Sequence, residues 1–322
     1  MLPTPSTSHV PYARVYEPAE DSFLFLDTLS SASETAFLAG RFSSPPSTTS
    51  TITSTTTSTT TSTTTPVASS PTLLILEVGP GSGVVLAFLT AHASHLFGGR
   101  RDVLTLGVDV NRVACEATRE TVRRAVDEAE PEAEETTTSA SDSAAEPEDK
   151  EGKPKAGTGY HLGTAQGDLT TAVRPHSVDV LVFNPPYVPT PDVPPMLAST
   201  TTITTTTTTT ASNTISSTTG TSSSTSSAFE EDSRLLALSY AGGRDGMEVT
   251  DRLIDALPEV LSERGVAYLL LCAQNKPEEV KGRIRGMGGE GGDVREWRAE
   301  TVGTSGRQAG WEKLQIVRIW RD

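Results

Sequence analysis

The stretch that decides the fold lies at residues 76–83, Leu76-Glu77-Val78-Gly79-Pro80-Gly81-Ser82-Gly83. It continues an apolar run from Leu73, which predicts a buried strand over residues 73–78. The alternate glycines then let the backbone approach a nucleotide-like ligand, because no Cβ is in the way. The dinucleotide fingerprint needs a glycine at position 84, where this chain has Val84. The turn therefore favours S-adenosylmethionine, which has no pyrophosphate, over a dinucleotide; a plain strand-to-helix turn is the alternative.

Outward from this turn, apolar strand patterns alternate with helical ones. The predicted strands are residues 73–78, 103–110, 160–166, 178–183, 266–272, 294–302 and 314–320. The predicted helices are residues 84–96, 112–126 and 248–263. This alternation is typical of an α/β fold: a Rossmann-like, mostly parallel seven-stranded sheet with helices on both faces. The last two strands, which have no convincing helix between them, are expected to add an antiparallel strand at one edge.

Three segments of the 322-residue chain have low complexity. Residues 43–70 are almost entirely Ser, Thr and Pro, residues 127–159 are rich in Glu, Asp, Ala and Thr, and residues 191–227 contain long threonine runs. None carries enough apolar surface to offset the entropy lost on ordering. We therefore predict one domain over residues 1–322, interrupted by disordered inserts at these three places.

The net charge, the cysteines and the lengths of the apolar runs argue against several kinds of partner and site. The formal net charge of -15 disfavours a nucleic-acid partner, because an acidic surface repels phosphates. Cys115 and Cys272 stand apart and outside any CxxC or Cys/His cluster, so no metal site is expected. Residues 1–15 lack the apolar stretch of a signal peptide, and the longest apolar run, residues 266–273, is too short to span a bilayer. A soluble intracellular protein without a membrane partner is expected.

Two acids follow predicted strands. Asp109 ends the second strand, where a carboxylate can accept hydrogen bonds from ribose hydroxyls. Asp168 follows the third strand in Gly167-Asp168-Leu169 and could bind an adenine amino group while Leu169 packs on the ring. A turn residue or helix N-cap remains the alternative for Asp109, and ordinary turn chemistry for Asp168. Their weight as cofactor ligands comes from their combination with the glycine turn.

The strongest signal is Asn184-Pro185-Pro186-Tyr187, directly after the strand at residues 178–183. The two prolines fix the backbone and remove two N–H donors, which leaves carbonyls free to accept. Asn184 adds a side-chain acceptor, so the loop can hold both hydrogens of an –NH2 group, and Tyr187 can wall a planar target. Amide and adenine nitrogens are poor nucleophiles. A loop that holds such a nitrogen in line with the methyl–sulfur bond of the cofactor compensates through orientation and charge stabilisation. A Pro-rich loop that merely ends a strand is the alternative.

These motifs resemble the class I methyltransferases that modify the glutamine of the Gly-Gly-Gln loop in translation release factors, in particular the short eukaryotic and archaeal branch. Three further blocks carry the resemblance: Val15-Tyr16-Glu17-Pro18-Ala19-Glu20-Asp21-Ser22, Ala241-Gly242-Gly243-Arg244-Asp245-Gly246 and Arg307-Gln308-Ala309-Gly310. The resemblance covers nearly everything except the three inserts. The chain departs from the family pattern at Pro80, where a small residue is usual, and in the long threonine insert after the substrate loop.

The resemblance implies a class I methyltransferase fold, S-adenosylmethionine as cofactor and a set of site residues. The implied cofactor contacts are Ser22, Glu77, Gly79, Asp109, Asp168, Leu169 and Asn184, to which we add Gly81 of the same turn. The implied substrate and catalytic site is Asn184, Pro185 and Tyr187, with Pro186 in the same loop. The resemblance also implies that residues 16–22 fold over the cofactor.

The resemblance further implies two protein partners. One is the substrate, the class I release factor, which would be methylated at N5 of its glutamine. The other is a small zinc-binding activator subunit, which in this family forms a heterodimer by docking along the edge strand, here residues 160–166. Such an enzyme is expected in the cytoplasm, with a possible nuclear pool.

Two other classes of function stay open. The loop at residues 184–187 also suits adenine, although the acidic balance disfavours nucleic acid. Lysine methylation does not require an enzyme to hold an amide group, so it would not explain the loop at residues 184–187. A non-catalytic, methyltransferase-like subunit is the third reading, but such proteins usually lose the cofactor acids or the substrate loop. The reaction is expected to be direct in-line transfer without a covalent enzyme intermediate or a metal.

Overall fold

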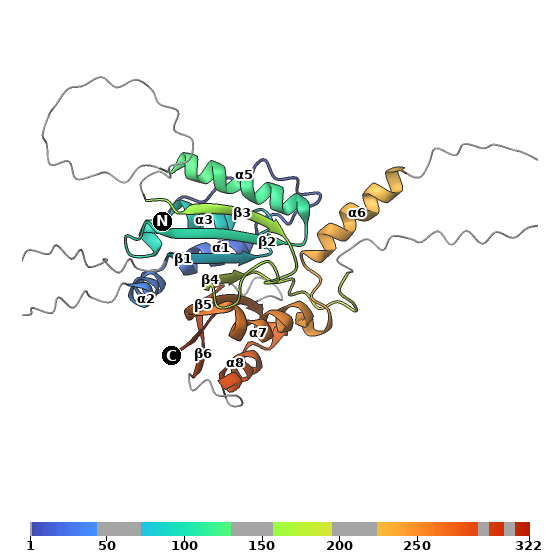
Figure 1. The fold of residues 1–322 in the computed structure, drawn as a ribbon. Helices are drawn as coiled ribbons and strands as arrows, with labels where there is room; N and C mark the ends of the chain where they lie inside the picture. The colour runs from blue at the N-terminus through green and yellow to red at the C-terminus, as the bar shows by residue number, and fades with distance from the viewer. Residues whose placement is uncertain (1, 44–71, 130–156, 195–223, 289–295, 306–312) are drawn as a thin grey trace, which may run out of the picture.

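The computed structural model describes residues 2–43, 72–129, 157–194, 224–288, 296–305 and 313–322. Their strands form one seven-stranded sheet in the order β3-β2-β1-β4-β5-β7-β6 (Figure 1). The strands are β1 (Leu73–Val78), β2 (Val103–Asp109), β3 (Tyr160–Gln166), β4 (Val178–Phe183), β5 (Leu261–Cys272), β6 (Trp297–Thr304) and β7 (Leu314–Arg321). The predicted Rossmann-like sheet is confirmed.

The direction of the strands decides where a ligand can bind. Strands β1 to β5 pair in parallel, and β7 pairs antiparallel with both β5 and β6. The final hairpin therefore lies at one edge, as predicted, with β6 outermost. The order reverses between β1 and β4, and the crevice at the carboxyl ends of such neighbouring strands is where open α/β sheets bind ligands. The opposite edge is β3, the strand predicted to receive a partner.

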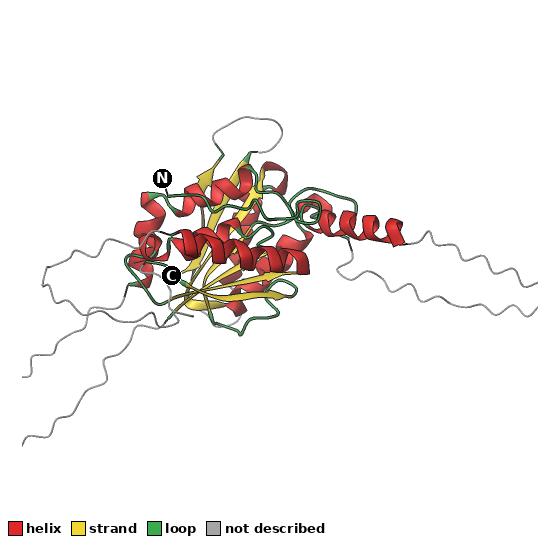
Figure 2. Cartoon of the chain, turned by 90° about the horizontal axis from the view of Figure 1, so that it is seen from above, coloured by secondary structure: helices red, strands yellow, loops and turns green. Residues whose placement is uncertain are grey.

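Helices cover both faces of the sheet (Figure 2). The helices are α1 (Glu20–Leu29), α2 (Ala32–Phe42), α3 (Val84–Ala91), α4 (Ala93–Leu96), α5 (Arg112–Glu128), α6 (Ser224–Leu238), α7 (Glu248–Val260) and α8 (Pro277–Arg285). Apolar side chains of α1 to α4 pack in one core layer, and those of α7 and α8 pack in the layer on the other face. Helix α6 projects away from the body of the molecule (Figure 1).

The structure corrects several predicted elements. Helices α1, α2, α6 and α8 are absent from the predicted helices, although α2 and α8 carry recognisable start signals. Ser31 caps α2 by accepting a hydrogen bond from the Glu34 N–H at 3.3 Å, and α8 begins with Pro277. The predicted helix at residues 248–263 ends instead at Val260, because Leu261 already pairs with β4.

Most of the three predicted inserts lies outside the described residues, but their ends do not. Helix α5 continues to Glu128, α6 begins at Ser224, and Thr158 is buried beside β3. Two helices and the residues before β3 therefore extend a few residues into the segments that were predicted as inserts. Among the described residues, no helix combines the length and the apolar character that a membrane crossing requires.

Candidate functional site

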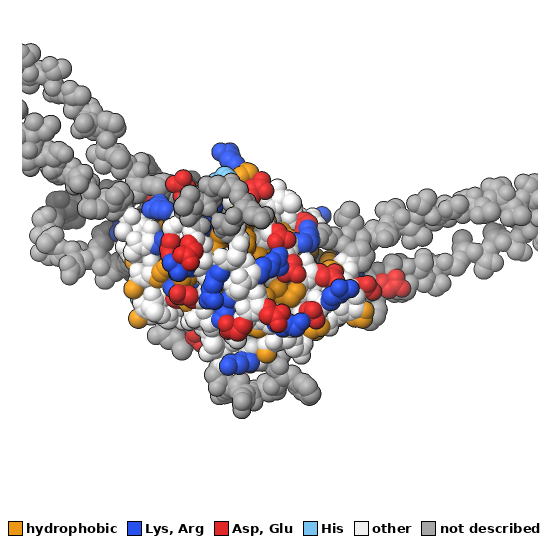
Figure 3. Space-filling model, turned by 90° about the horizontal axis from the view of Figure 1, so that it is seen from below, with side chains coloured by type: hydrophobic (Ala, Val, Ile, Leu, Met, Phe, Trp, Pro, Cys, Tyr) orange, Lys and Arg blue, Asp and Glu red, His pale blue; other side chains and the backbone are white. Residues whose placement is uncertain are grey.

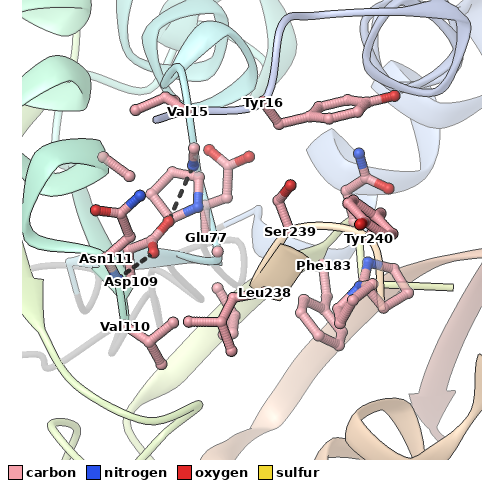
Figure 4. A pocket seen from close by; sticks show the side chains of 18 of the residues that line it. Val15, Tyr16, Glu77, Asp109, Val110, Asn111, Phe183, Leu238, Ser239 and Tyr240 are labelled. Atoms are coloured by element: carbon pink, nitrogen blue, oxygen red, sulfur yellow. Dashed lines mark hydrogen bonds between the residues drawn. The ribbon is translucent and has the colours of Figure 1, made fainter. Parts of the chain in front are cut away.

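A cavity of about 310 Å³ opens at the carboxyl ends of β1 and β4 (Figure 4). The structure brings every predicted site residue to its wall: Ser22, Glu77, Gly79, Gly81, Asp109, Asp168, Leu169, Asn184, Pro185, Pro186 and Tyr187. They come from the N-terminal segment and from the ends of strands that are distant in sequence. Parallel strands explain this convergence, because their carboxyl ends meet at the same edge of the sheet.

The turn after β1 needs its glycines. Gly79, Gly81 and Gly83 all have positive φ, at 61°, 54° and 79°, a region that side chains with a Cβ disfavour. A Cβ on Gly83 would also lie only 2.7 Å from the Cα of Thr118 on α5. The turn is thus pressed against α5, and its backbone faces the cavity. The Gly81 N–H donates a hydrogen bond to Oδ2 of Asp109 at 3.1 Å, which joins the turn to the end of β2.

Two buried carboxyl groups stand at one side of the cavity (Figure 4). Burial, and to a lesser extent the charge of Asp109, raises the pKa of Glu77 to about 8 against the opposing effect of a backbone hydrogen bond at Leu86. Burial likewise raises the pKa of Asp109 to about 6, although the N–H groups of Asn111 and Gly81 donate to its oxygens. One Glu77 oxygen, Oε2, is buried without a hydrogen-bond partner. Such costly acceptors are typical of a ligand site.

The third predicted acid has a different environment. Oδ2 of Asp168 forms an ion pair with the Arg252 guanidinium of α7, and the Asp168 side chain keeps 29% of its surface exposed. Leu169 next to it is buried and adopts a positive φ of 50°. Strained non-glycine backbone of this kind persists only where the surroundings hold it, and it is frequent at binding sites.

Asn184 lines the cavity and has one side-chain acceptor without a hydrogen-bond partner. Its Nδ2 donates a hydrogen bond to Oδ2 of Asp21 at 3.0 Å, whereas its Oδ1 is buried and has no partner. The opposite orientation of the amide would set two acceptors against each other, since an ionised carboxylate cannot donate. Asp21 is itself held by α1, where its Oδ1 accepts from the Ser22 N–H at 2.6 Å. The N-terminal helix therefore fixes the direction in which the Asn184 oxygen points.

Two further parts of the chain complete the cavity. Arg14 and Val15 belong to the N-terminal segment, and Leu235, Leu238, Ser239 and Tyr240 come from the end of α6 and the residues after it. Tyr240 lies on the other side of the cavity from Glu77 and Asp109 (Figure 4). The two parts meet where Arg14 Nε contacts Asp232 Oδ1 at 2.5 Å. The α6 residues were missed because the threonine-rich insert hid the helix; the i, i+3 spacing of Leu235 and Leu238 was the available signal.

These residues fit S-adenosylmethionine. The unpaired oxygen of Glu77 and the carboxylate of Asp109 can accept hydrogen bonds from ribose hydroxyls. Apolar side chains at the same wall, including Val110, Leu169 and Leu238, can pack on a planar base. Glycine turns without side chains leave room for the ligand beside β1.

Known proteins similar to this chain are methyltransferases. The chain is 29% identical to "Methyltransferase HEMK2" of Mus musculus, covering 99% of this chain and 96% of that protein, and 28% identical to its Homo sapiens counterpart, covering 98% and 95%. It is 26% identical to the "eRF1 methyltransferase catalytic subunit mtq2" of Schizosaccharomyces pombe, covering 100% and 96%. A solved TehB-like SAM-dependent methyltransferase from Corynebacterium glutamicum aligns with a TM-score of 0.32 and 11% identity, over 78% of this chain and 81% of that one. No model of a known protein family matches.

The nearly full-length similarity to these curated methyltransferases, one of them named for eRF1, confirms the predicted resemblance to release-factor methyltransferases. It supports an enzyme of the S-adenosylmethionine-dependent methyltransferase class, in agreement with the sheet order and with the acceptors that line the cavity.

Proposed function

We propose that this chain methylates the side-chain amide nitrogen of a glutamine in a protein, and that the target is the Gly-Gly-Gln loop of the class I translation release factor. The single observation that carries the proposal is the unpaired, buried Oδ1 of Asn184 in the cavity. An acceptor in that position suits a target group with N–H donors. The relative from Schizosaccharomyces pombe, which is named for its action on eRF1, supports the choice of target.

The chain's own residues would divide the work between cofactor and target. Glu77, Asp109 and Asp168 would hold the cofactor by its hydroxyl and amino groups, with Ser22, Gly79, Gly81 and Leu169 shaping the same wall. When bound, S-adenosylmethionine supplies a methyl group carried on a positively charged sulfur. Asn184 and the carbonyl of Pro185 would accept the two N–H groups of the target, which aims the nitrogen lone pair. Pro186 and Tyr187 would border the target side chain.

The same site could accept adenine in a nucleic acid. The charges on the protein surface help to decide between this substrate and a protein. On the face seen in Figure 3, Lys and Arg side chains are interspersed with Asp and Glu side chains. A nucleic-acid substrate is best served by a continuous basic stripe. The mixed charge on this face and the net charge of -15 favour a protein target.

We also propose that the described parts act as one methyltransferase domain and that a small zinc-binding activator subunit covers β3. This edge strand exposes two large side chains, Tyr160 at 44% and Leu162 at 57%. An uncovered edge strand with apolar side chains is an aggregation hazard, which a partner would remove. Leu162→Lys should then abolish co-purification of the two subunits, whereas unchanged co-purification would place the interface elsewhere.

The proposed function is tested by transfer of labelled methyl groups to the purified release factor, with and without the activator subunit. A release factor with its loop glutamine changed to alanine is the matched control. Label on the wild-type release factor that vanishes on this control is the expected result. Cofactor binding without label, with the activator present, would exclude the glutamine target and make adenine or lysine substrates the next to assay.

A further inference from the structure

Asn275 lies at the end of β5 in a short 3-10 turn (Ala273–Asn275), with only 2% of its surface exposed. Its side chain joins segments that are far apart in sequence. Oδ1 accepts from the Cys272 N–H at 2.8 Å, while Nδ2 donates to the backbone carbonyls of Tyr187 at 3.1 Å and Asp245 at 2.9 Å. One amide thus connects the strand end, the loop after β4 and the turn before α7.

The turn before α7 is shaped to receive the loop after β4. A Cβ on Gly246 would lie 2.0 Å from the Tyr187 carbonyl oxygen, and one on Gly242 would lie 2.2 Å from that of Pro186. Only glycine permits these backbone contacts. The contacts give a physical reason for glycine at these two positions of the block Ala241–Gly246.

The backbone around Asn275 is strained on two sides. Asp245, whose carbonyl Asn275 binds, has a φ of 55°, and Lys276, the next residue, has a φ of 53°. Each such residue costs on the order of 1–3 kcal/mol and is maintained only where neighbouring contacts determine it. One strained residue thus belongs to the turn before α7, and the other directly follows Asn275, whose side chain joins that turn to the loop after β4.

The loop is held at both ends, and Asn275 acts between them. Upstream, Phe183 is paired within the sheet; downstream, the Val188 N–H donates to the Tyr240 carbonyl at 3.0 Å. Pro185 and Pro186 have no N–H with which to anchor the segment between. The bond from Asn275 to the Tyr187 carbonyl therefore fixes the peptide that follows the two proposed acceptor residues.

We propose that Asn275 is a positioning residue for methyl transfer, which holds the Tyr187 carbonyl and thereby sets the acceptors of Asn184 and Pro185 against the target. This inference rests on the proposed role of residues 184–187 as the substrate loop. Displacements of about 1 Å in such a site can lower a rate by about 100-fold. Asn275 does not line the cofactor cavity among its described residues, so cofactor affinity should not depend on it.

The test compares Asn275→Ala and Gly246→Ala, which disturb the Tyr187 carbonyl from two directions, with Tyr268→Phe as the control. Tyr268→Phe removes a buried 2.8 Å hydrogen bond to Glu34 from the same strand without touching the loop. In the complex with the activator, kcat per cofactor-binding site should fall about 10- to 100-fold in the first two variants. The cofactor Kd should stay within about threefold in all variants, and the control should keep its kcat.

Hydrogen exchange gives a readout that does not depend on the substrate. The Val188 and Thr190 amides, which bond to the carbonyls of Tyr240 and Gly243, should exchange faster in Asn275→Ala than in wild type. Unchanged exchange together with an unchanged kcat would overturn the inference. Faster exchange in a protein whose wild type never labels the release factor would show that Asn275 holds the loop, but it would reject the proposed target and with it the role of Asn275 in that transfer.

Discussion

Two glutamates of this molecule are equally buried, Glu34 at 2% and Glu77 at 3% exposure, yet their surroundings differ in kind. On α2, both Glu34 oxygens accept from the Arg318 guanidinium at 2.9 and 3.1 Å, and the Tyr268 hydroxyl donates to one of them at 2.8 Å. At the end of β1, Glu77 keeps one oxygen without a partner, and burial raises its pKa to about 8. Burial alone therefore does not tell whether the protein itself supplies hydrogen-bond partners to an acid.

The difference lies in whether the protein itself supplies the partner. A buried ion pair with hydrogen bonds around it holds elements together, here α2 against β5 and β7. A buried acceptor left unpaired beside a cavity destabilises the folded protein. A bound ligand that donates a hydrogen bond to this acceptor would explain why it is there. The same reasoning applies to Asn184, whose Nδ2 donates a hydrogen bond to Asp21 while its Oδ1 has no donor.

The largest effect should come from removing the glutamate whose two oxygens are both paired. Glu34→Ala leaves the Arg318 charge buried, with 11% of its side chain exposed, and the Tyr268 hydroxyl without its acceptor. We expect the free energy of unfolding to fall by about 3–5 kcal/mol in urea titrations at pH 7. Glu300→Ala removes the other, exposed partner of Arg318 and should cost less than about 1 kcal/mol. Equal losses in both variants would contradict a special role for burial.

The next effect should appear in catalysis. Asn184→Ala removes the unpaired acceptor, so kcat for methyl transfer should fall about 100- to 1,000-fold, if the oxygen stabilises the target amide as proposed. Cofactor affinity, measured by calorimetry, should fall much less. Comparable losses in kcat and in cofactor affinity would instead show that Asn184 serves the cofactor.

A smaller effect should separate the two glutamates by pH. Folded Glu77, with a pKa near 8, holds its proton where the unfolded chain, at its ordinary value of 4.5, has lost it. The folded state then binds more protons, so stability falls as pH rises from about 4.5 to 8 and levels off above that. We compare pH 6.5 with pH 8, because both values lie above the pKa of about 6 of Asp109. Over this range the free energy of unfolding of cofactor-free wild type should fall by about 1–2 kcal/mol relative to that of Glu77→Gln.

Urea titrations of both proteins at the two pH values measure this difference. Glu34→Gln provides the matched comparison, because it removes a paired carboxylate and should destabilise the protein at both pH values. A stability difference between wild type and Glu77→Gln that does not change with pH would show that Glu77 is ionised throughout, and the contrast between the two buried acids would then be lost.

The sequence was sufficient to predict the residues that the strand ends bring together. Glu77, Asp109 and Asn184 each end or follow a parallel strand, and the geometry of a parallel sheet makes such residues neighbours whatever their separation in the chain. The glycine turn was predictable for the same reason, since its conformation is local.

The contacts that orient these residues were not predictable. Asp21 reaches Asn184 across 163 residues because α1 folds back over the sheet, and Asn275 reaches Tyr187 across 88. Neither pairing leaves a periodic or compositional signal in one sequence. Helix α6 was hidden for another reason, since its first residues continue a Ser/Thr-rich tract whose composition predicts disorder.

The smallest effect concerns an acid that lies between the two extremes. Asp168 lines the cavity, as Glu77 does, but it already has a partner, as Glu34 does, in the Arg252 guanidinium. With 29% and 48% of the two side chains exposed, water screens this pair, so Arg252→Ala should change stability by less than about 1 kcal/mol. Cofactor Kd, measured at low and high salt, should change by less than about threefold. A larger loss of affinity in Arg252→Ala would mean that Arg252 orients Asp168 for the ligand, as Asp21 orients Asn184, and that a paired acid can also be a functional one.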